Sequence, residues 1–394
     1  MAKLGVTGLT KRYGGFVAVD DIDMEIDEGE FVFLLGPSGC GKTTTLRMIA
    51  GLEMPSQGKI RLGERNVTYL KARYRNVGMV FQDYGLYRHM TVHGNIAYPL
   101  KVRKMPKAEI ERKVGEVSEL MQITDVLSRK PDQLSAGQLQ RVAISRMLVR
   151  DADIFLMDEP MSHLDAQLRG QMRAELRHLQ KQIGVTTIFV THDQLEAMTM
   201  ADRIMVMRAG RMLQFATPRE IFDRPGNEFV ATFVGEPHMN VVDAVLATAG
   251  DRLVARIDDV DIPLDADWVA ENRLRERAGT KVRLGIRPEH IAIGEARDAL
   301  HPLPGALVAF EPTGTENLYV FLANGAEINT RTSTEETRHL SKEPGSQFWL
   351  GLDPNWLYLF DPKDGHTIAF ALASSTEGVR QPAKRRPEYE GAEL

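Results

Sequence analysis

The chain has 394 residues, of which 43% are hydrophobic and 26% charged, and this balance is typical of a globular protein. At about 150 residues per domain, the length predicts two or three domains. Lys and Arg total 49 against 54 Asp and Glu, and the net charge of −5 argues against nucleic acid as the default partner.

The first part of the sequence predicts strands followed by a loop and a helix. Apolar and polar residues alternate at 4–9 and 22–26, and 31–35 is a continuous apolar run, so we expect three strands there. A glycine-rich loop at 36–41 follows the third strand. It leads into a helical pattern that ends at Gly51.

Residues 84–150 turn helical, and we interpret them as an inserted helical subdomain with clear helices at 105–121 and 134–149. Strand and helix patterns then alternate again, which predicts a largely parallel sheet and a first domain that spans 1–235. The later elements are a strand at 154–157, a helix at 165–183, and strands at 187–190 and 204–207.

The pattern changes in the second half of the chain. Short strand candidates separated by turns predict an all-β second domain at 236–372. The last stretch, 373–394, has almost no large apolar residues, and we expect a disordered tail. The strand candidates are 241–246, 253–257, 282–286, 306–310, 318–322, 327–331 and 348–352.

The cysteine content and the apolar segments indicate the cellular compartment in which we expect the chain. The single cysteine, Cys40, excludes an intrachain disulfide and a metal site built from several cysteines, and it is consistent with a reducing compartment. Residues 1–15 contain no apolar core segment, so they do not predict a secretion signal. No apolar stretch reaches the roughly 20 residues that a membrane-spanning helix needs. We therefore expect a cytosolic chain, and another chain would supply any membrane span.

The glycine-rich loop matches the motif G-x-x-x-x-G-K-[ST], and it stands between a buried strand and a helix, as the motif requires. Backbone N–H groups of such a loop curl around phosphate oxygens, and the helix N-terminus adds positive potential. Lys42 is expected to reach the β and γ phosphates, and Thr43 to bind Mg²⁺. A glycine turn that merely caps a helix would not explain this Lys-Thr pair. The predicted nucleotide contacts are Gly36, Pro37, Ser38, Gly39, Cys40, Gly41, Lys42, Thr43 and Thr44.

Polar residues end the next two apolar strands. Asp158 and Glu159 follow the strand at 154–157, which places one carboxylate near Mg²⁺ and the other near an attacking water. Two solvent-facing acids are the alternative, but the phosphate loop upstream favours the first interpretation. His192 follows the strand 187–191, where it can hydrogen-bond a γ-phosphate, although such a histidine taken alone is more often structural.

Residues 134–141, Leu-Ser-Ala-Gly-Gln-Leu-Gln-Arg, together with these motifs resemble the signature of ABC transporter ATPase subunits, whose usual form is LSGGQ. The resemblance covers almost the whole chain. It implies that this helix N-terminus faces the γ-phosphate held by a second ATPase subunit, so that two chains sandwich two ATP molecules. A serine that opens a helix would alone be an ordinary N-cap. The implied contacts across this interface are Ser135, Ala136, Gly137 and Gln138.

Other family positions map onto single residues. Tyr13 matches the aromatic that stacks on adenine, and a surface tyrosine is the alternative. Gln82 matches the glutamine that contacts Mg²⁺ and the attacking water and senses the membrane subunit, and an exposed loop residue is the alternative. The loop 162–165 matches the segment that contacts the opposing site. The resemblance thus implies that Lys42, Gln82, Glu159 and His192 are catalytic and that Thr43, Gln82 and Asp158 hold the metal.

Within this family the chain is similar to the ATPases of carbohydrate importers of the maltose and glycerol-phosphate type, through residues 79–82, 191–198 and 233–235. Residues 285–290 and 357–361 resemble their OB-like C-terminal regulatory domain. The implied fold is an α/β P-loop ATPase domain with an inserted helical subdomain, followed by a C-terminal all-β OB-like domain.

The implied function is that of a peripheral ATPase subunit on the cytoplasmic face of the membrane. It dimerises on ATP, with Mg²⁺ as cofactor, and drives separate transmembrane permease subunits that import a sugar, a polyol such as glycerol, or a related carbohydrate. An extracellular solute-binding protein would act indirectly, and nucleic acid is not an expected partner. Solute selectivity lies in those other chains.

Three residues depart from the family pattern. Ala136 replaces a glycine of the signature, and Arg88 and His163 stand where proline and asparagine are commoner. If position 136 needs a positive φ, alanine costs ~1–2 kcal/mol there, and otherwise its methyl group crowds the phosphate. We interpret Ala136 as tolerated. These departures also raise the hypothesis of a mixed pair with a related ATPase, besides a homodimer.

Two other classes of function are alternatives. A soluble ABC ATPase that acts on nucleic acid or ribosomes would resemble a tandem cassette or carry a long coiled-coil insertion, and this chain has one cassette and a negative charge. A nucleotide-switched scaffold whose β domain binds a regulator is the second alternative. The intact Glu159 argues against it.

Overall fold

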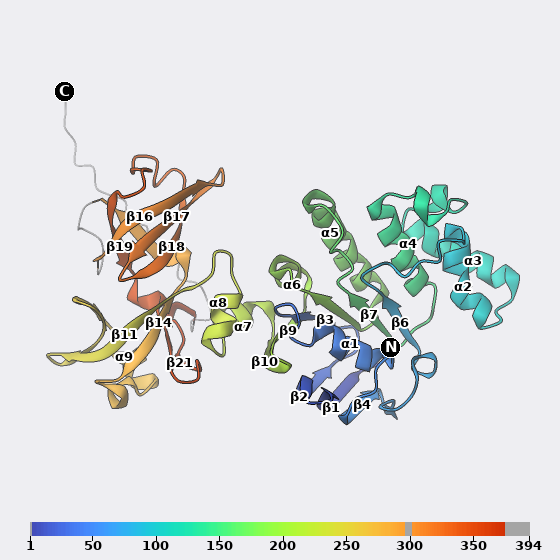
Figure 1. Ribbon diagram of the computed structural model, residues 1–394, viewed down its shortest axis with the longest axis horizontal. Helices are drawn as coiled ribbons and strands as arrows, with labels where there is room; N and C mark the ends of the chain where they lie inside the picture. Colours follow the sequence, from blue (N-terminus) through green and yellow to red (C-terminus); the bar gives the residue numbers. More distant parts are fainter. Residues whose placement is uncertain (1, 296–301, 375–394) are drawn as a thin grey trace. The chain divides into compact units, whose positions relative to one another are not determined.

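The computed structural model describes residues 2–295 and 302–374, and these form two compact units that divide between Ile221 and Phe222 (Figure 1). The tail expected at 373–394 lies outside the described residues from position 375 onward. The domain limits expected from sequence, 1–235 and 236–372, stay predictions.

The first unit is built on a six-stranded sheet in the order β10-β9-β3-β8-β7-β6. Neighbours from β9 to β6 run parallel, and β10 pairs with β9 in the antiparallel sense, so the largely parallel sheet is confirmed. The strands β3, β7 and β8 are buried along their whole length, which explains their continuous apolar runs. The bounds are β3 (Phe31–Leu35), β6 (Val77–Val80), β7 (Ile154–Asp158), β8 (Thr187–Thr191), β9 (Arg203–Arg208) and β10 (Arg211–Ala216).

A second, antiparallel sheet of the same unit has the order β2-β1-β4-β5. Apolar residues of both sheets form one core with the helix α1, in which Leu4, Leu34 and Leu46 are all fully buried. Helix α1 contacts β7 and β8 of the parallel sheet and β2 of the antiparallel sheet, so it packs between the two sheets. The strands are β1 (Leu4–Tyr13), β2 (Phe16–Ile26), β4 (Gln57–Leu62) and β5 (Arg65–Asn66).

Three helices of the first unit, α2, α3 and α4, lie together at one side of the unit (Figure 1). They form the predicted helical subdomain. Helices α3, α4 and α5 agree with the predicted ranges within two residues at each end. Within the described residues, no helix is both long enough and apolar enough to cross a bilayer. The bounds are α1 (Lys42–Ala50), α2 (Val92–Val102), α3 (Lys107–Leu120), α4 (Ala136–Leu148), α5 (Ala166–Ile183) and α6 (Gln194–Met200).

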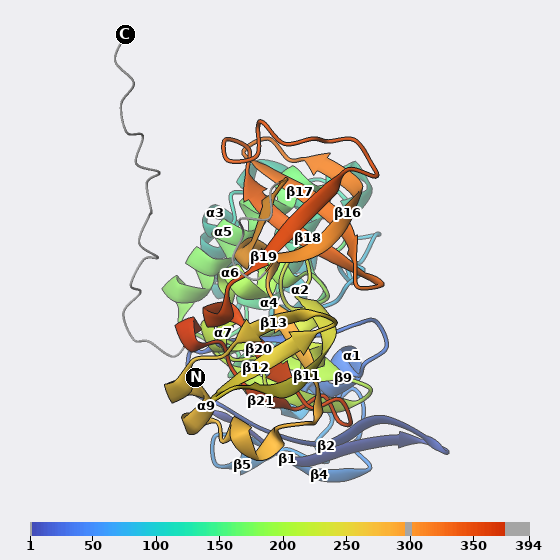
Figure 2. The ribbon, with the colours of Figure 1, turned by 90° about the vertical axis from the view of Figure 1, so that its left-hand side faces the viewer.

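The second unit contains two antiparallel sheets, in the orders β13-β12-β11-β14-β20-β21 and β15-β19-β16-β17-β18 (Figure 2). Buried residues of both sheets form a single apolar core, including Leu284, Phe321 and Phe348. Three short helices precede or interrupt the first of these sheets: α7 (Pro218–Asp223) and α8 (Glu228–Phe233) come before β11, and α9 (Ala266–Glu271) lies between β13 and β14. The strands are β11 (Asn240–Ala249), β12 (Arg252–Ile257), β13 (Val260–Pro263), β14 (Lys281–Ile286), β15 (Ile291–Gly294), β16 (Pro302–Pro312), β17 (Glu316–Ala323), β18 (Ala326–Ser333), β19 (Gln347–Leu352), β20 (Tyr358–Phe360) and β21 (Thr367–Ala369).

A buried arginine attaches the segment between α7 and β11 to the second unit. Arg287 is 2% exposed, and its guanidinium donates to the carbonyls of Val234 at 3.0 Å and Phe222 at 2.6 Å. It also lies 3.5 Å from the ring centroid of Phe222. Burial lowers the pKa of Arg287. These bonds explain why residues after Phe222 pack with the strand-rich unit although their own pattern is helical.

Candidate active site

The loop between β3 and α1 has the backbone shape of a phosphate cradle. Gly41 precedes α1 with a φ of 107°, and no side chain caps this helix N-terminus among the described residues. A Cβ at Gly36 would lie 2.3 Å from the carbonyl oxygen of Met207, and one at Gly41 would lie 2.6 Å from that of Ala18. Only glycine fits at these two positions, and the loop with its free helix N-terminus suits an anion.

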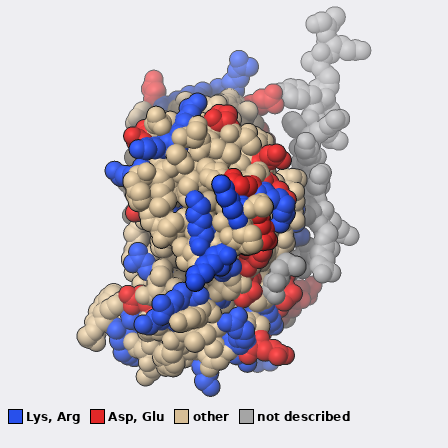
Figure 3. Space-filling view, turned by 90° about the vertical axis from the view of Figure 1, so that its right-hand side faces the viewer, with Lys and Arg blue, Asp and Glu red and all other residues tan. Residues whose placement is uncertain are grey.

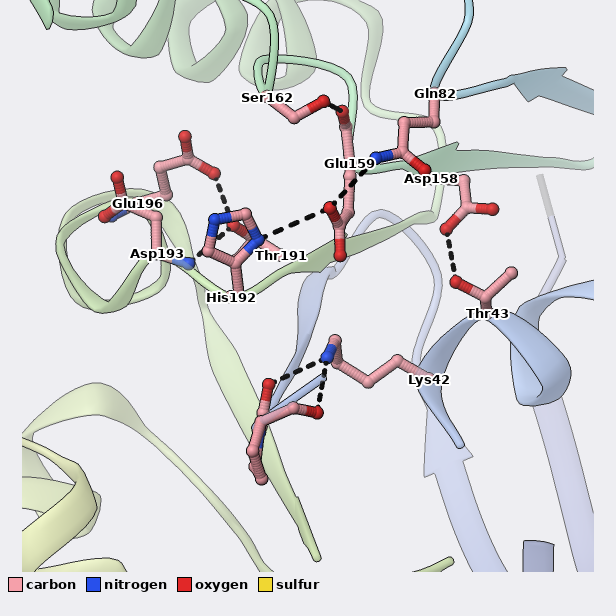
Figure 4. A network of polar contacts seen from close by, with 12 residues as sticks. Lys42, Thr43, Gln82, Asp158, Glu159, Ser162, Thr191, His192, Asp193 and Glu196 are labelled. Carbon is pink, nitrogen blue, oxygen red and sulfur yellow. Dashed lines mark hydrogen bonds and ion pairs between the residues drawn. The ribbon is translucent and has the colours of Figure 1, made fainter. Parts of the chain in front are cut away.

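Lys42 places its charge over this loop. Its Nζ donates to the carbonyls of Gly36 at 2.7 Å and Pro37 at 3.1 Å (Figure 4). The side chain is buried against the loop, and the Cys40 sulfur lies 3.9 Å from Nζ. Burial raises the pKa of the Cys40 thiol, which therefore stays neutral at physiological pH. Cys40 is a small buried residue of the loop rather than a reactive one.

The first residues of α1 meet the end of β7. Thr43 Oγ1 donates to Asp158 Oδ1 at 2.9 Å. Burial raises the pKa of Asp158, while the Thr43 hydrogen bond and the charges of Arg47 and Lys42 act in the opposite direction. A hydroxyl and a carboxylate side by side are hard oxygen donors of the kind that Mg²⁺ prefers, so the pair fits this metal.

Glu159 lies between two polar side chains from other elements. Its Oε2 accepts from Gln82 Nε2 at 3.4 Å and lies 3.3 Å from His192 Nδ1. Its backbone has a φ of 45°, and its carbonyl accepts from Ser162 Oγ at 2.9 Å. The His192 side chain is 56% exposed and that of Glu159 is 20% exposed. The carboxylate is thus oriented from two sides and still reachable by water.

Residues far apart in the sequence therefore meet at the carboxyl edge of the parallel sheet (Figure 4). This is the place where open α/β sheets bind ligands. One predicted group lies elsewhere: within the described chain, no hydrogen bond or ion pair links the signature residues 135–138 to Lys42, Asp158 or Glu159.

The signature residues instead form the N-terminus of α4. Ser135 and Gln138 bond each other in a capping box, with Ser135 Oγ accepting from Gln138 N at 3.3 Å. Ala136 is the exposed first residue of the helix, whereas Gly137 is buried and a Cβ there would lie 3.1 Å from Leu168. The cost of a positive φ at Ala136 therefore does not arise. Close packing against Leu168 favours glycine at position 137, and the exposed position 136 has no such restriction.

Tyr13 ends β1 in an exposed hairpin. Its side chain is 46% exposed, and the Lys11 ammonium lies 4.8 Å from its ring centroid. The hairpin returns through β2, whose Ala18 approaches Gly41 of the phosphate loop. Phe16, the cross-strand partner of Tyr13, is 65% exposed and was not singled out by the sequence. The hairpin thus exposes two aromatic rings, of which Tyr13 is the predicted adenine contact.

We expect Tyr13→Ala to weaken ATP binding by about 2- to 10-fold, because a stacked aromatic contact is worth about 0.5–1.5 kcal/mol beyond its area. Tyr13→Phe keeps the ring and should change the affinity little. Equilibrium titration with ATP measures this, and Phe16→Ala is the matched control on the same hairpin. Equal affinity of wild type and Tyr13→Ala would contradict the role of Tyr13.

Sequence reasoning missed Glu196 and Arg169, which bond residues on either side of His192. Glu196 is 4% exposed and bonds Thr191, and Arg169 pairs with Asp193. The one available signal was an acidic residue three positions after the helix-capping Asp193, and this pattern is common at helix starts.

The fold and these contacts define a P-loop ATPase with a strand-rich C-terminal unit. Comparison with known families shows matches to the ABC transporter family at residues 19–162, the MalK OB fold domain at 235–291 and the TOBE domain at 284–360.

Curated relatives match along nearly their whole length. The trehalose/maltose import ATP-binding protein MalK of Thermococcus litoralis is 49% identical over 386 residues, covering 93% of this chain and 100% of that protein. The xylose/arabinose import ATP-binding protein XacK of Haloferax volcanii is 44% identical, covering 93% and 96%. The sn-glycerol-3-phosphate import ATP-binding protein UgpC of Chromobacterium violaceum is 43% identical, covering 95% and 98%.

A solved structure is similar to about half of this chain. CbiO1 of Clostridium perfringens, part of the ABC transporter complex CbiONQ, matches with a TM-score of 0.52 and 30% identity, covering 55% of this chain and 89% of that one. The chain belongs to the ATP-binding proteins of ABC transporters, and it is an ATPase.

Proposed function

We propose that this chain is the ATP-hydrolysing subunit of an importer for a sugar, a polyol or a related carbohydrate. The observation that carries the proposal is the Glu159 carboxylate, which lies between Gln82 and His192 beside the phosphate loop. Relatives that match nearly the whole chain are named import ATP-binding proteins for trehalose and maltose, for xylose and arabinose, and for sn-glycerol-3-phosphate.

The reaction is phosphoryl transfer from ATP to water. Lys42 neutralises charge on the transferred phosphate, Glu159 orients or deprotonates the attacking water, and His192 hydrogen-bonds the γ-phosphate. Gln82 holds the Glu159 carboxylate in place. Mg²⁺, when bound by Thr43, Asp158 and Gln82, neutralises the phosphate oxygens. Tyr13 stacks on the adenine.

A second ATPase subunit completes each site. The N-terminus of α4 exposes Ser135 and Ala136 at the surface of the helical subdomain, and the buried Gly137 follows them in the first turn. A helix N-terminus favours an anion such as a γ-phosphate. Since these residues do not reach the phosphate loop of their own chain, a second cassette must offer them. That cassette is either another copy of this chain or a related ATPase.

We propose that the permease binds in a groove next to Gln82. The groove has a volume of about 240 Å³ and lies between the sheet and the helical subdomain, with Phe81 and Tyr84 in its wall. Arg146 and Arg150 of the α4 region also line it. Basic side chains gather in a band on the side of the first unit that carries this subdomain (Figure 3). A partner here would be in direct reach of the Gln82 loop.

The permease supplies the membrane span, and this chain sits peripherally on the cytoplasmic face. An extracellular solute-binding protein acts on the other side of the permease and affects this chain only indirectly. Transport needs no nucleic acid.

The assembly is tested by purifying the complex through a tag on this chain from its own organism and weighing it by native mass spectrometry. We expect two ATPase subunits together with membrane chains, because each site needs the α4 N-terminus of a partner. Two copies of this chain would make Ala136 a tolerated variant, and one copy beside a related ATPase would support the mixed pair. A complex with one ATPase subunit or without a membrane chain would contradict the proposal.

A further inference from the structure

A buried carboxylate lies directly behind the turn that carries His192, and the reaction described above does not use it. Glu196 of α6 is 4% exposed, and its Oε2 accepts from Thr191 Oγ1 at 2.7 Å (Figure 4). The same Thr191 oxygen accepts from the backbone N–H of Asp193 at 2.9 Å. The two neighbours of His192 are therefore tied to each other and to Glu196.

The turn is also attached to a second loop. Asp193 Oδ1 accepts from Glu196 N at 3.1 Å, and Asp193 Oδ2 accepts from Arg169 Nη1 at 3.1 Å. Arg169 Nη2 donates to the carbonyl of Leu164 at 3.1 Å. The loop 162–165 thus connects through Arg169 to the turn 191–193. The resemblance to ABC transporter ATPases implies that this loop contacts the opposing site.

The side chain of His192 makes few contacts that fix its position. Its side chain is 56% exposed, and Glu159, at 3.3 Å, is its hydrogen-bonding partner within residues 2–295 and 302–374. A half-exposed ring with one contact takes its position from its backbone. That backbone is held by the hydrogen bonds of Thr191 and Asp193.

We propose that Glu196 is a positioning residue that, through Thr191, holds the turn 191–193 so that His192 points at the transferred phosphate. The inference rests on the proposed role of His192. Loss of the Glu196 carboxyl frees the Thr191 hydroxyl and loosens the turn, while the phosphate loop, on a different element, keeps its shape. The expected loss is therefore in turnover rather than in ATP binding.

The charge state of Glu196 supports this arrangement. The pKa of Glu196 is raised to about 7, chiefly by burial and also by the charge of Asp193, against the hydrogen bond from Thr191 and the charges of Arg169 and Arg173, which lower it. Glu159 and His192 are the other titratable groups that line the small space around it. Below about pH 7 the carboxyl is neutral and still accepts from Thr191.

Ionisation of Glu196 changes the strength of its hydrogen bond from Thr191. The hydrogen bond from Thr191 is one of the causes that lower this pKa, so the bond is stronger to the carboxylate than to the neutral carboxyl. The hold on the turn therefore strengthens as the pH rises through the pKa of Glu196.

The test measures ATP turnover and ATP affinity in the complex purified through the full-length chain. Glu196→Ala and Thr191→Val should each lower kcat by about 10- to 100-fold and change the ATP Kd by less than about twofold. Glu196→Gln keeps the shape and the acceptor oxygen, so it should retain most of the turnover. Thr199→Val is the matched control, because Thr199 is exposed on the same helix and bonds the carbonyl of Leu195.

The pH profile separates positioning from a merely structural role. Glu196→Gln cannot ionise and cannot gain the stronger bond to Thr191, so the ratio of its kcat to that of the wild type should fall between about pH 6 and about pH 8. A flat ratio would overturn the inference, and so would an equal loss of ATP binding and turnover in Glu196→Ala and Thr191→Val.

His192→Ala distinguishes a failure of this inference from a failure of the proposed function. If His192→Ala is inactive and Glu196→Ala has normal kcat, the positioning role is wrong and the role of His192 stands. If His192→Ala has normal kcat, the proposed role of His192 itself is wrong, and the positioning role falls with it.

Discussion

Glu159→Gln is expected to stop ATP turnover and to leave ATP binding intact. A positioned general base contributes about 10²- to 10⁴-fold to a rate, and the amide of glutamine cannot accept a proton from water. The phosphate contacts come from the loop of Lys42 and from Thr43, which do not touch residue 159. Binding should therefore survive, and the ATP-bound pair of cassettes should accumulate because its substrate is not consumed.

Turnover, ATP affinity and the oligomeric state measured on the assembled complex check this result. Glu119→Gln is the matched control, because Glu119 is an exposed glutamate at the end of α3. Its turnover should equal that of the wild type. Normal turnover in Glu159→Gln would show that another group activates the water, and loss of ATP binding would show that Glu159 has a role in holding the nucleotide.

Arg75→Ala is expected to lower the stability of the first unit by about 3–5 kcal/mol, because it leaves several buried carbonyls without a donor. Arg75 is fully buried. Its guanidinium donates to Met48 and Ile49 at the end of α1, at 2.6 and 2.9 Å. It also donates to Leu70 at 2.7 Å and to Thr68 at 2.8 Å. One side chain thus joins the helix behind the phosphate loop to the segment before β6.

Chemical denaturation followed by a signal from the first unit measures this loss. Arg75→Lys should recover only part of it, because an ammonium cannot reach carbonyls in several directions as the planar guanidinium does. Arg61→Ala on the exposed side of β4 is the control and should change stability little. An unfolding midpoint of Arg75→Ala equal to that of the Arg61 variant would contradict the structural role of Arg75.

Local sequence patterns were sufficient for much of the fold. Continuous apolar runs predicted β3, β7 and β8, because buried parallel strands must be apolar on both faces. Helical periodicity placed α3, α4 and α5 within two residues at each end. The strands β4, β5, β6, β10, β13, β15, β20 and β21 were missed. All of them except β4 and β10 have at most four residues, and the alternation in β4 spans only residues 59–62, which is too short to stand out.

The sequence by itself also determined which residue types could serve ATP hydrolysis. A Gly-rich loop with Lys42 and Thr43 after a buried strand, and paired carboxylates after another, have few other uses. These features depend on neighbours in the chain and on fixed backbone requirements, such as the glycines that approach the carbonyls of Ala18 and Met207. Such constraints act locally, so they are visible in one sequence.

Only the tertiary structure decided which side chains meet. The contacts of Glu159 with Gln82 and His192, the bond from Glu196 to Thr191 and the burial of Arg75 join elements that the sheet order brings together. Ala136 could be judged only once it was found exposed at the first position of α4. Burial and hydrogen bonding depend on every element that packs around a group, and no pattern along a single segment contains that information.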